Sequence, residues 1–315
     1  MRLVFMGTPA FVTPVLDALA RAPDVRVVGV YTPPDRPRGR GQSPEMPPVK
    51  AYALERGLSV YQPASLRSER SQMELAGLRP DVVVVAAYGK ILPPPALNTP
   101  LHGCLNLHPS LLPKYRGPSP VATAILDGEA VTGIVLMLLD EGMDTGPVIA
   151  QLEHPLSGRE TAETLTATLF QLGAELLLRA LAPWVAGGLT ARPQDGAQAT
   201  VTRKLERADG QADWGLSAEA LERRRRAYTP WPGLFTHWQG KALKLLDVVA
   251  LPPEDIRLRR TVPGQVVLLE TEEAPVGVGC GQGLLGLKAV QLEGRRAIAA
   301  GEFLRGYPQF IGARL

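Results

Sequence analysis

The first half of the chain alternates short apolar runs with segments of helical character, and this alternation restricts the fold more than any other feature. Uninterrupted apolar runs of this length are typical of strands that are buried on both faces. They occupy residues 3–6, 25–31, 82–87, 105–108 and 133–138. Helices are expected between them at residues 11–21, 49–56, 68–76 and 121–126. The pattern predicts an α/β fold with a doubly wound, Rossmann-like parallel sheet, which binds ligands outside the carboxyl ends of its strands.

The 315 residues are enough for about two domains. Leucines recur at helical spacing over residues 162–184, and this helix is expected to close a catalytic domain of residues 1–185. Residues 186–212 are polar and irregular, which is typical of a linker. Residues 213–315 begin with a helix capped by Ser217 and continue with short strands separated by Gly and Pro, so they predict a smaller, OB-like β-barrel. Its strands are expected at residues 234–238, 243–249, 264–269, 276–280 and 285–290.

The composition excludes several classes of protein. Hydrophobic residues make up 45% of the chain and charged residues 21%, as in ordinary globular proteins. The two cysteines, Cys104 and Cys280, lie too far apart for a disulfide framework or a Cys-rich metal site, so no metal and a cytoplasmic location are expected. No apolar run approaches the roughly 18 residues of a membrane span, and no membrane partner is expected.

Two polar side chains stand at the end of one apolar run. Asn106 and His108 are two residues apart in a predicted strand, so their side chains share one face of the sheet. The turn after residues 133–138 contains Asp144 and is expected at the same edge. An amide can donate to an oxygen that becomes negative, an imidazole can transfer a proton near neutral pH, and a carboxylate can orient that imidazole. The set suits acyl transfer.

No Ser or Cys is clearly paired with His108, because Cys104 is flanked by apolar residues and is interpreted as packing. Direct attack by a substrate amine is therefore favoured over a covalent enzyme intermediate. Each residue also has an ordinary structural interpretation. Asn106 could bond a turn, His108 could cap a strand, and Asp144 lies in a Gly-rich turn where Asp is common.

The stretch from Asn106 to Gly117, together with Asp144, resembles the signature of the 10-formyltetrahydrofolate-dependent formyltransferases, whose catalytic trio is an Asn, a His and an Asp in this order. Within that superfamily the methionyl-tRNA formyltransferases are the most similar, and the resemblance extends over the whole chain. Further similar segments are residues 4–11, 34–41, 85–93 and 228–233. Two departures are visible: Pro109 replaces a frequent Gly, and Gln42 and Ser43 replace frequent lysines.

The resemblance implies that the α-amine of methionyl initiator tRNA attacks the formyl carbon of 10-formyltetrahydrofolate, the formyl donor. Asn106 and protonated His108 would donate to the oxygen of the tetrahedral intermediate, while Asp144 would charge the imidazole and pass protons. The C-terminal barrel would bind tRNA, and the enzyme would act as a monomer. The folate site would be formed by Ala87, Tyr88, Gly89, Ile91, Leu92, Ser110, Leu111, Leu112, Pro113, Asp140 and Gly142.

Basic residues cluster in two segments. Arg36, Arg38 and Arg40 lie among prolines, so their segment cannot be a helix or a central strand. A long loop of this kind is either solvated or functional, and arginine binds phosphate well, so the loop is assigned to tRNA binding. Residues 223–226 are four arginines on a predicted helix, where successive side chains face different directions. From residue 206 onward, 15 Lys or Arg and 13 Asp or Glu leave a net charge of +2, so RNA contact by this part must come from local clustering.

Four other functions are compatible with these residues. A glycinamide ribonucleotide formyltransferase shares the trio but usually ends near the first domain. A sugar-nucleotide formyltransferase also has a second domain. The catalytic domain could instead hydrolyse formyl-folate, or the chain could be a non-catalytic RNA-binding module, against which the intact trio argues. Turnover with different acceptors discriminates among them.

Overall fold

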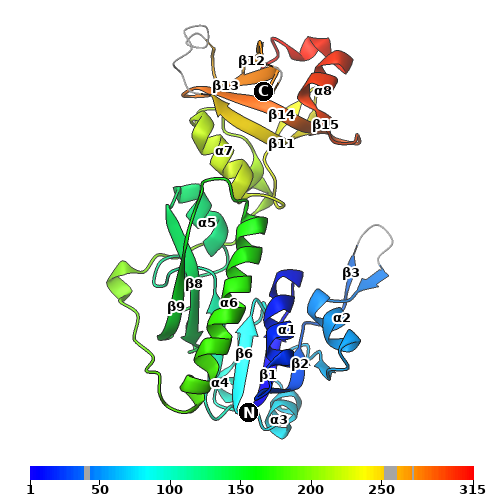
Figure 1. Cartoon of the computed structure of the whole chain (residues 1–315). Helices are drawn as coiled ribbons and strands as arrows, with labels where there is room; N and C mark the ends of the chain where they lie inside the picture. The colour runs from blue at the N-terminus through cyan, green and yellow to red at the C-terminus, as the bar shows by residue number, and fades with distance from the viewer. Residues whose placement is uncertain (39–42, 252–260, 272) are drawn as a thin grey trace. The chain divides into compact units, whose positions relative to one another are not determined.

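The structure is a computed structural model that describes residues 1–38, 43–251, 261–271 and 273–315 (Figure 1). The chain forms two compact units, each with its own sheet. Unit 1 consists of Met1–Pro120, Val131–Leu156 and Leu165–Arg203. Unit 2 consists of Val121–Ala130, Ser157–Thr164 and Lys204–Leu315. Two short segments that precede helix α6 (Ala162–Val185) or overlap its start therefore belong to unit 2.

Unit 1 contains a seven-stranded sheet with the order β5-β2-β1-β6-β7-β8-β9. The strands are β1 (Arg2–Gly7), β2 (Arg26–Tyr31), β5 (Val60–Tyr61), β6 (Val82–Ala86), β7 (Cys104–His108), β8 (Val131–Leu138) and β9 (Val148–Pro155). The first five in this order are parallel, whereas β8 is antiparallel to β7 and β9 is antiparallel to β8. The predicted Rossmann-like α/β fold is confirmed. Its sheet is mixed because the last two strands form a hairpin.

Apolar runs in the sequence predict only those strands that are buried on both faces. Leu3, Val4, Phe5 and Met6 of β1 have no exposed surface, and the valines at the start of β6 have none either. Strands covered on both faces need an apolar residue at every position. The edge strand β9 alternates between half-buried and exposed residues, and its sequence mixes apolar with charged side chains. The pattern of continuous apolar runs therefore does not predict β9.

The helices of the first half are α1 (Thr13–Arg21), α2 (Pro48–Glu55), α3 (Glu69–Gly77), α4 (Pro94–Leu97), α5 (Pro120–Asp127) and α6 (Ala162–Val185), with a 3-10 turn η1 (Ala10–Val12) before α1. Ser68 caps α3 by accepting a hydrogen bond from the Ser71 N–H. Gly173 lets α6 approach β8, since a Cβ there would lie 2.6 Å from Ile134 Cδ1. By length and composition α6 is apolar enough to cross a membrane, but half of that apolar stretch is buried inside the protein, as in a core helix.

Unit 2 contains an all-antiparallel sheet of six strands with the order β10-β11-β14-β13-β12, in which β15 also pairs with β14. These strands are β10 (Phe235–Trp238), β11 (Lys241–Leu251), β12 (Val266–Leu268), β13 (Val276–Gly279), β14 (Leu284–Leu292) and β15 (Ile298–Ala299), and the helices are α7 (Ala218–Ala227) and α8 (Ala300–Gly306). Trp238 packs against Phe303 and Phe310 at ring distances of 5.7 and 5.1 Å in the core. The predicted smaller C-terminal β domain is confirmed.

The segment assigned to a linker is divided between the two units. Its residues up to Arg203 belong to unit 1, and those from Lys204 onward belong to unit 2. Arg192 and Val148 of β9 exchange both backbone hydrogen bonds, at 2.8 and 2.7 Å. The first part of this polar segment is thus paired with the edge of the unit 1 sheet, and its polar side chains serve the site described next.

Candidate active site

Strand β7 carries the two polar residues of the site. It lies between β6 and β8, with Asn106 paired to Val85 on one side and Met137 on the other. The Asn106 side chain is half-buried, and among the described residues its amide makes no hydrogen bond. His108 is only 4% exposed. The strand therefore presents a free amide and, two residues further on, a buried imidazole.

Both ring nitrogens of His108 face acceptor oxygens. Nε2 is 2.9 Å from the Tyr115 carbonyl oxygen, and Nδ1 is 3.6 Å from Asp144 Oδ1. Because a carbonyl can only accept, Nε2 carries a proton, and the neutral ring then turns a bare nitrogen toward the carboxylate. Only the doubly protonated ring can donate to both oxygens. The 3.6 Å between Nδ1 and Asp144 Oδ1 is too long for a direct hydrogen bond. An atom of a water or of a substrate can therefore form hydrogen bonds with both residues.

Asp144 is held at its side chain and at its backbone. Its Oδ2 accepts a 2.7 Å hydrogen bond from the Gly117 N–H. Its backbone has a left-handed φ of +55°, a conformation that Asp tolerates better than most residues. Gln194 Nε2 donates to the Asp144 carbonyl at 2.9 Å and to the Gly146 carbonyl at 2.7 Å. These bonds fix the carboxylate beside His108.

Arg116 fixes the orientation of Gln194. Its guanidinium donates two hydrogen bonds, of 3.0 and 2.8 Å, to Gln194 Oε1. With the oxygen so occupied, the amide nitrogen must face the carbonyls of Asp144 and Gly146. Sequence reasoning gives no role to Arg116. It gives none to Gln194 either, which lies in the segment assigned to a linker. The only signal in the sequence is the polar composition of that segment.

Two threonines from the same segment hold the loop after β7. Thr200 Oγ1 accepts from the Tyr115 N–H at 2.8 Å, and Thr202 donates its N–H to the Arg116 carbonyl at 2.7 Å. Gly117 has a φ of +100°, and a Cβ there would lie 2.7 Å from the Thr202 carbonyl oxygen. Glycine is therefore required for the Gly117 N–H to reach Asp144.

The turn that carries Asp144 follows β8 and begins beside the amino end of β7, not beside its carboxyl end. Since β8 is antiparallel, its last residue Leu138 pairs with Leu105, and the Leu139 N–H donates to the Cys104 carbonyl at 2.7 Å. The expectation that this turn leaves from the carboxyl edge of the parallel strands is wrong. The turn instead folds back toward His108, and Asp144 meets the ring from there.

The loop after β6, assigned to folate, is rigidly built. Ala87 and Gly89 both have left-handed backbones, with φ of +47° and +77°. Thr8 Oγ1 donates to the Tyr88 carbonyl at 2.9 Å. Lys90 Nζ donates to the carbonyls of residues 63 and 64 at 2.7 and 2.8 Å. Burial, with a smaller effect of the nearby Arg36 charge, lowers the pKa of Lys90 below its ordinary value.

Apolar members of the folate set lie in two neighbouring clusters. Tyr88 and Leu92 are buried in one, and Leu112 is buried with Met137 in the other. Leu139, which precedes the Asp140 turn, packs against both clusters. The structure therefore brings the loop after β6, the loop after β7 and the Asp140 turn together in unit 1.

The remaining members of the set have distinct surroundings. The side chain of Ile91 is 74% exposed. Ser110 is buried and donates to the Lys114 carbonyl at 2.7 Å. Asp140 Oδ1 accepts from the Gly142 N–H and from Thr145 Oγ1, so this carboxylate shapes its own turn. Leu111 packs against Gly133, and the Pro113 carbonyl accepts from the N–H of residue 200.

The arginine segment forms a hairpin. β3 (Arg36–Arg38) pairs with β4 (Ser43–Glu45), with Pro37 opposite Pro44, and Arg36 is exposed. Asp35 anchors the base, because Lys50 Nζ donates to it at 2.7 Å and Gln62 Nε2 at 2.8 Å. The hydrogen bond from Lys50 is the main cause that lowers the pKa of Asp35. Arg40 lies outside the described residues.

Two family models match the chain. The formyl transferase family matches residues 1–181, and the formyl transferase C-terminal domain matches residues 204–308. The second match begins where the last segment of unit 2 begins. The residues between the two matches include Gln194, Thr200 and Thr202, which hold the candidate site.

Known relatives are similar along the whole chain. A methionyl-tRNA formyltransferase of Roseiflexus sp. (strain RS-1) is 45% identical over 315 residues, covering 100% of this chain and 95% of that protein. A methionyl-tRNA formyltransferase of Dehalococcoides mccartyi is 44% identical over 316 residues, covering 100% and 98%.

Solved structures share the fold at lower identity. HypX from Aquifex aeolicus in complex with tetrahydrofolic acid has a TM-score of 0.64 at 19% identity, over 99% of this chain and 48% of that chain. An N-formyltransferase from Helicobacter canadensis in complex with folinic acid and dTDP-3-aminofucose has a TM-score of 0.64 at 17% identity, over 94% and 99%. At these identities the likeness shows the fold alone.

Proposed function

The chain belongs to the methionyl-tRNA formyltransferase family of the formyl transferases, and from this we infer that it transfers the formyl group of 10-formyltetrahydrofolate to the α-amino group of methionyl initiator tRNA. The product, N-formylmethionyl-tRNA, is used to start translation. The observation that carries this function is the 45% identity over 100% of the chain, which includes both units. In this proposal unit 1 supplies the reacting groups, and unit 2 supplies further surface for the RNA.

We assign the chemistry to Asn106, His108 and Asp144. The amine nitrogen forms a bond to the formyl carbon, and the carbonyl electrons move to the formyl oxygen. The free amide of Asn106 is the donor suited to that oxygen. When the tetrahedral intermediate collapses, the bond from carbon to N10 breaks. The amine loses a proton and N10 gains one, so tetrahydrofolate leaves without any change of oxidation state.

The proton transfer is assigned to the gap between His108 and Asp144. The 3.6 Å separation of Nδ1 and Oδ1 leaves both atoms able to bond the substrate nitrogen or a water. The Tyr115 carbonyl keeps the ring oriented through Nε2 at 2.9 Å. His108 can thus be charged while an anionic intermediate exists, and Asp144 stabilises that charge.

The folate donor is proposed to contact the two rigid loops and the Asp140 turn. Support comes from Leu139, which packs against the clusters of both loops. The exposed side chain of Ile91 is available to an aromatic ring of the donor. The trio and its supporting residues all come from unit 1 of one chain, which supports the proposal of a monomer. Because the product is used to start translation, we propose that the enzyme acts in the cytoplasm.

Direct attack by the amine makes Cys104 dispensable. Burial raises the pKa of this thiol to about 12, and its Sγ lies 3.6 Å from the Ala96 carbonyl. Because the thiolate is the reactive form, burial and the raised pKa should together make alkylation by iodoacetamide very slow. Mass spectrometry of the folded protein should find Cys104 unmodified, and Cys104→Ala should keep its turnover. Loss of transfer in this variant would argue for a covalent intermediate, and the protein unfolded in urea is the control for reagent access.

The arginine hairpin, formed by β3 and β4, is proposed to bind tRNA phosphates. Replacing Arg36, Arg38 and Arg40 by alanine should raise KM for methionyl-tRNA and leave KM for the folate unchanged. Because each phosphate contact contributes about 0.7 to 0.9 to the slope of log K against log salt, loss of three should flatten it by about 2 to 3. The matched control is the triple alanine variant of three exposed arginines elsewhere in unit 1, namely Arg67, Arg70 and Arg179. Equal behaviour of the two triple variants would make the hairpin an ordinary solvated loop.

An acceptor assay tests the function itself. The purified protein is given labelled 10-formyltetrahydrofolate with methionyl initiator tRNA, a 4-amino sugar nucleotide, glycinamide ribonucleotide, or no acceptor. Formylation of the tRNA alone is expected. Transfer to the sugar nucleotide or to glycinamide ribonucleotide would assign one of the rival functions, and release of formate without acceptor would indicate a hydrolase.

A further inference from the structure

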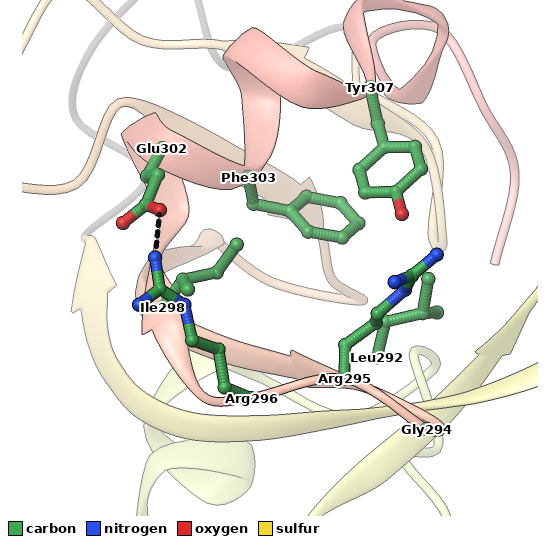
Figure 2. A pocket seen from close by; sticks show the side chains of 8 residues that line it. All are labelled: Leu292, Gly294, Arg295, Arg296, Ile298, Glu302, Phe303 and Tyr307. Atoms are coloured by element: carbon green, nitrogen blue, oxygen red, sulfur yellow. Dashed lines mark hydrogen bonds and ion pairs between the residues drawn. The ribbon is translucent and has the colours of Figure 1, made fainter.

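A surface cleft of about 440 Å³ lies in unit 2 between the turn that joins β14 to β15 and helix α8 (Figure 2). Its volume is in the range of sites that hold small organic groups, roughly 300 to 1,000 Å³. The turn contributes two arginines, and α8 with the residue that follows it contributes a carboxylate and two aromatic rings. The residues that matter are Arg295, Arg296, Glu302, Phe303 and Tyr307.

One wall of the cleft is a rigid aromatic group. Phe303 is 2% exposed and lies 4.8 Å from the half-buried ring of Tyr307. Trp238 supports both rings from the core, at 5.7 and 5.5 Å. These ring contacts hold Tyr307 against the core, and the residue remains partly exposed. Figure 2 shows its hydroxyl on the side of Arg295.

The two arginines of the turn differ in their partners. Arg296 is neutralised by Glu302, with 3.1 Å between guanidinium nitrogen and carboxylate oxygen. Arg295 is exposed, and in the described part of the chain no carboxylate pairs with its guanidinium. Its backbone is nevertheless fixed, because its N–H donates to Leu292 and its carbonyl accepts from Gln291 Nε2, both at 2.9 Å. The cleft thus holds one uncompensated positive charge next to an aromatic ring and a hydroxyl.

Two arginines of the basic run on α7 are paired within the protein. Arg226 pairs with Glu222 at 2.8 Å, and Arg225 lies 3.6 Å from Asp247. Because residues 206–315, which form most of unit 2, carry 15 basic and 13 acidic residues, their net charge of +2 is too small to attract RNA in general. A contact with RNA must therefore use a local feature such as Arg295.

We propose that this cleft binds one nucleotide of an RNA. Arg295 would donate to a phosphate oxygen, for which the guanidinium fork is well shaped. Tyr307 would offer its ring to the base or ribose and its hydroxyl to the same phosphate. A single guanidinium holds a free nucleotide weakly, whereas a polymer adds contacts elsewhere, so RNA is favoured. The identity of that RNA as methionyl-tRNA rests on the function proposed above.

The test compares Arg295→Gln with Arg305→Gln, which removes the same charge from α8 outside the cleft. The Kd for methionyl-tRNA is measured by filter binding over a range of salt. Arg295→Gln should raise Kd roughly tenfold and lower the salt slope by about 1, with kcat unchanged. Tyr307→Leu should raise Kd without changing the slope, while Tyr307→Phe should have a smaller effect. Turnover with methionyl-adenosine, which lacks the remaining RNA, should be the same in all variants.

Three results would overturn the proposal. The first is an Arg295→Gln variant that binds tRNA like Arg305→Gln. The second is an equal loss with methionyl-adenosine, which would show a structural effect. The third is that AMP binds to the cleft in an Arg295-dependent way while tRNA binding is unchanged. Failure of the proposed function is distinct, because it would appear as absent formylation by the wild type, whereas RNA binding can still be measured.

Discussion

Replacing His108 by alanine is expected to lower kcat roughly 10²- to 10⁴-fold, the usual contribution of a positioned proton-transfer group. The ring loses its contacts with the Tyr115 carbonyl and with Asp144, and no other described residue can take its place between them. His108→Gln separates chemistry from packing. Its amide can still donate to the Tyr115 carbonyl, but it cannot carry a proton, so it should be nearly as inactive as alanine.

Substitution of Asn106 or Asp144 should also lower kcat strongly, but each for a different physical reason. Asn106→Ala removes the free amide and should cost roughly 10²- to 10³-fold in kcat, the size of one oxyanion donor. Asp144→Asn keeps an oxygen that can accept from the Gly117 N–H, so the turn should stay in place while the charge beside His108 is lost. Single-turnover rates and tRNA binding should be measured together, because binding is expected to stay unchanged.

A control for these variants is available in the chain. Asn98, the only other asparagine, is exposed at the end of α4, and Asn98→Ala should keep wild-type turnover. Any variant of the trio that keeps more than about a tenth of wild-type turnover would remove that residue from the mechanism.

The predictable part of the fold is the part with a strong local pattern. Leu3 to Met6 and the valines of β6 are apolar at every position because helices and neighbouring strands leave them no solvent. The direction of a strand leaves no such trace in its composition. For that reason β8 is predicted as a strand but not as antiparallel, and the Asp144 turn is expected at the wrong end of β7.

The candidate site likewise contains residues that the sequence predicts and residues that it does not. Asn106, His108 and Asp144 can be predicted as candidates because they stand in a short recognisable string or turn. Gln194 and Arg116 are 78 residues apart, and Gln194 is 50 residues from Asp144. Such contacts follow no period of helix or strand, so a polar segment that binds the site looks the same as a polar segment that faces water.

Gln194 should therefore prove to be a positioning residue, although it touches no substrate in this scheme. Gln194→Ala removes both hydrogen bonds to the Asp144 turn and leaves the Arg116 guanidinium without its acceptor. With about 0.5 to 1.5 kcal/mol for each hydrogen bond lost, kcat should fall roughly 10- to 100-fold. Both KM values should change little, because the substrate-binding loops keep their own contacts.

Gln194→Glu tests the direction of these bonds. The shape is kept and Arg116 can still bind one oxygen, but the other oxygen now faces two carbonyls that can only accept. The Glu variant should be no more active than the alanine variant. Gln198→Ala is the matched control, since that glutamine lies in the same segment and, among the residues that the structure describes, its side chain bonds Asp195 alone, at 2.9 Å. If Gln194→Glu restored the rate, or if KM rose as much as kcat fell, Gln194 would stabilise unit 1 in general and would not hold Asp144 against His108.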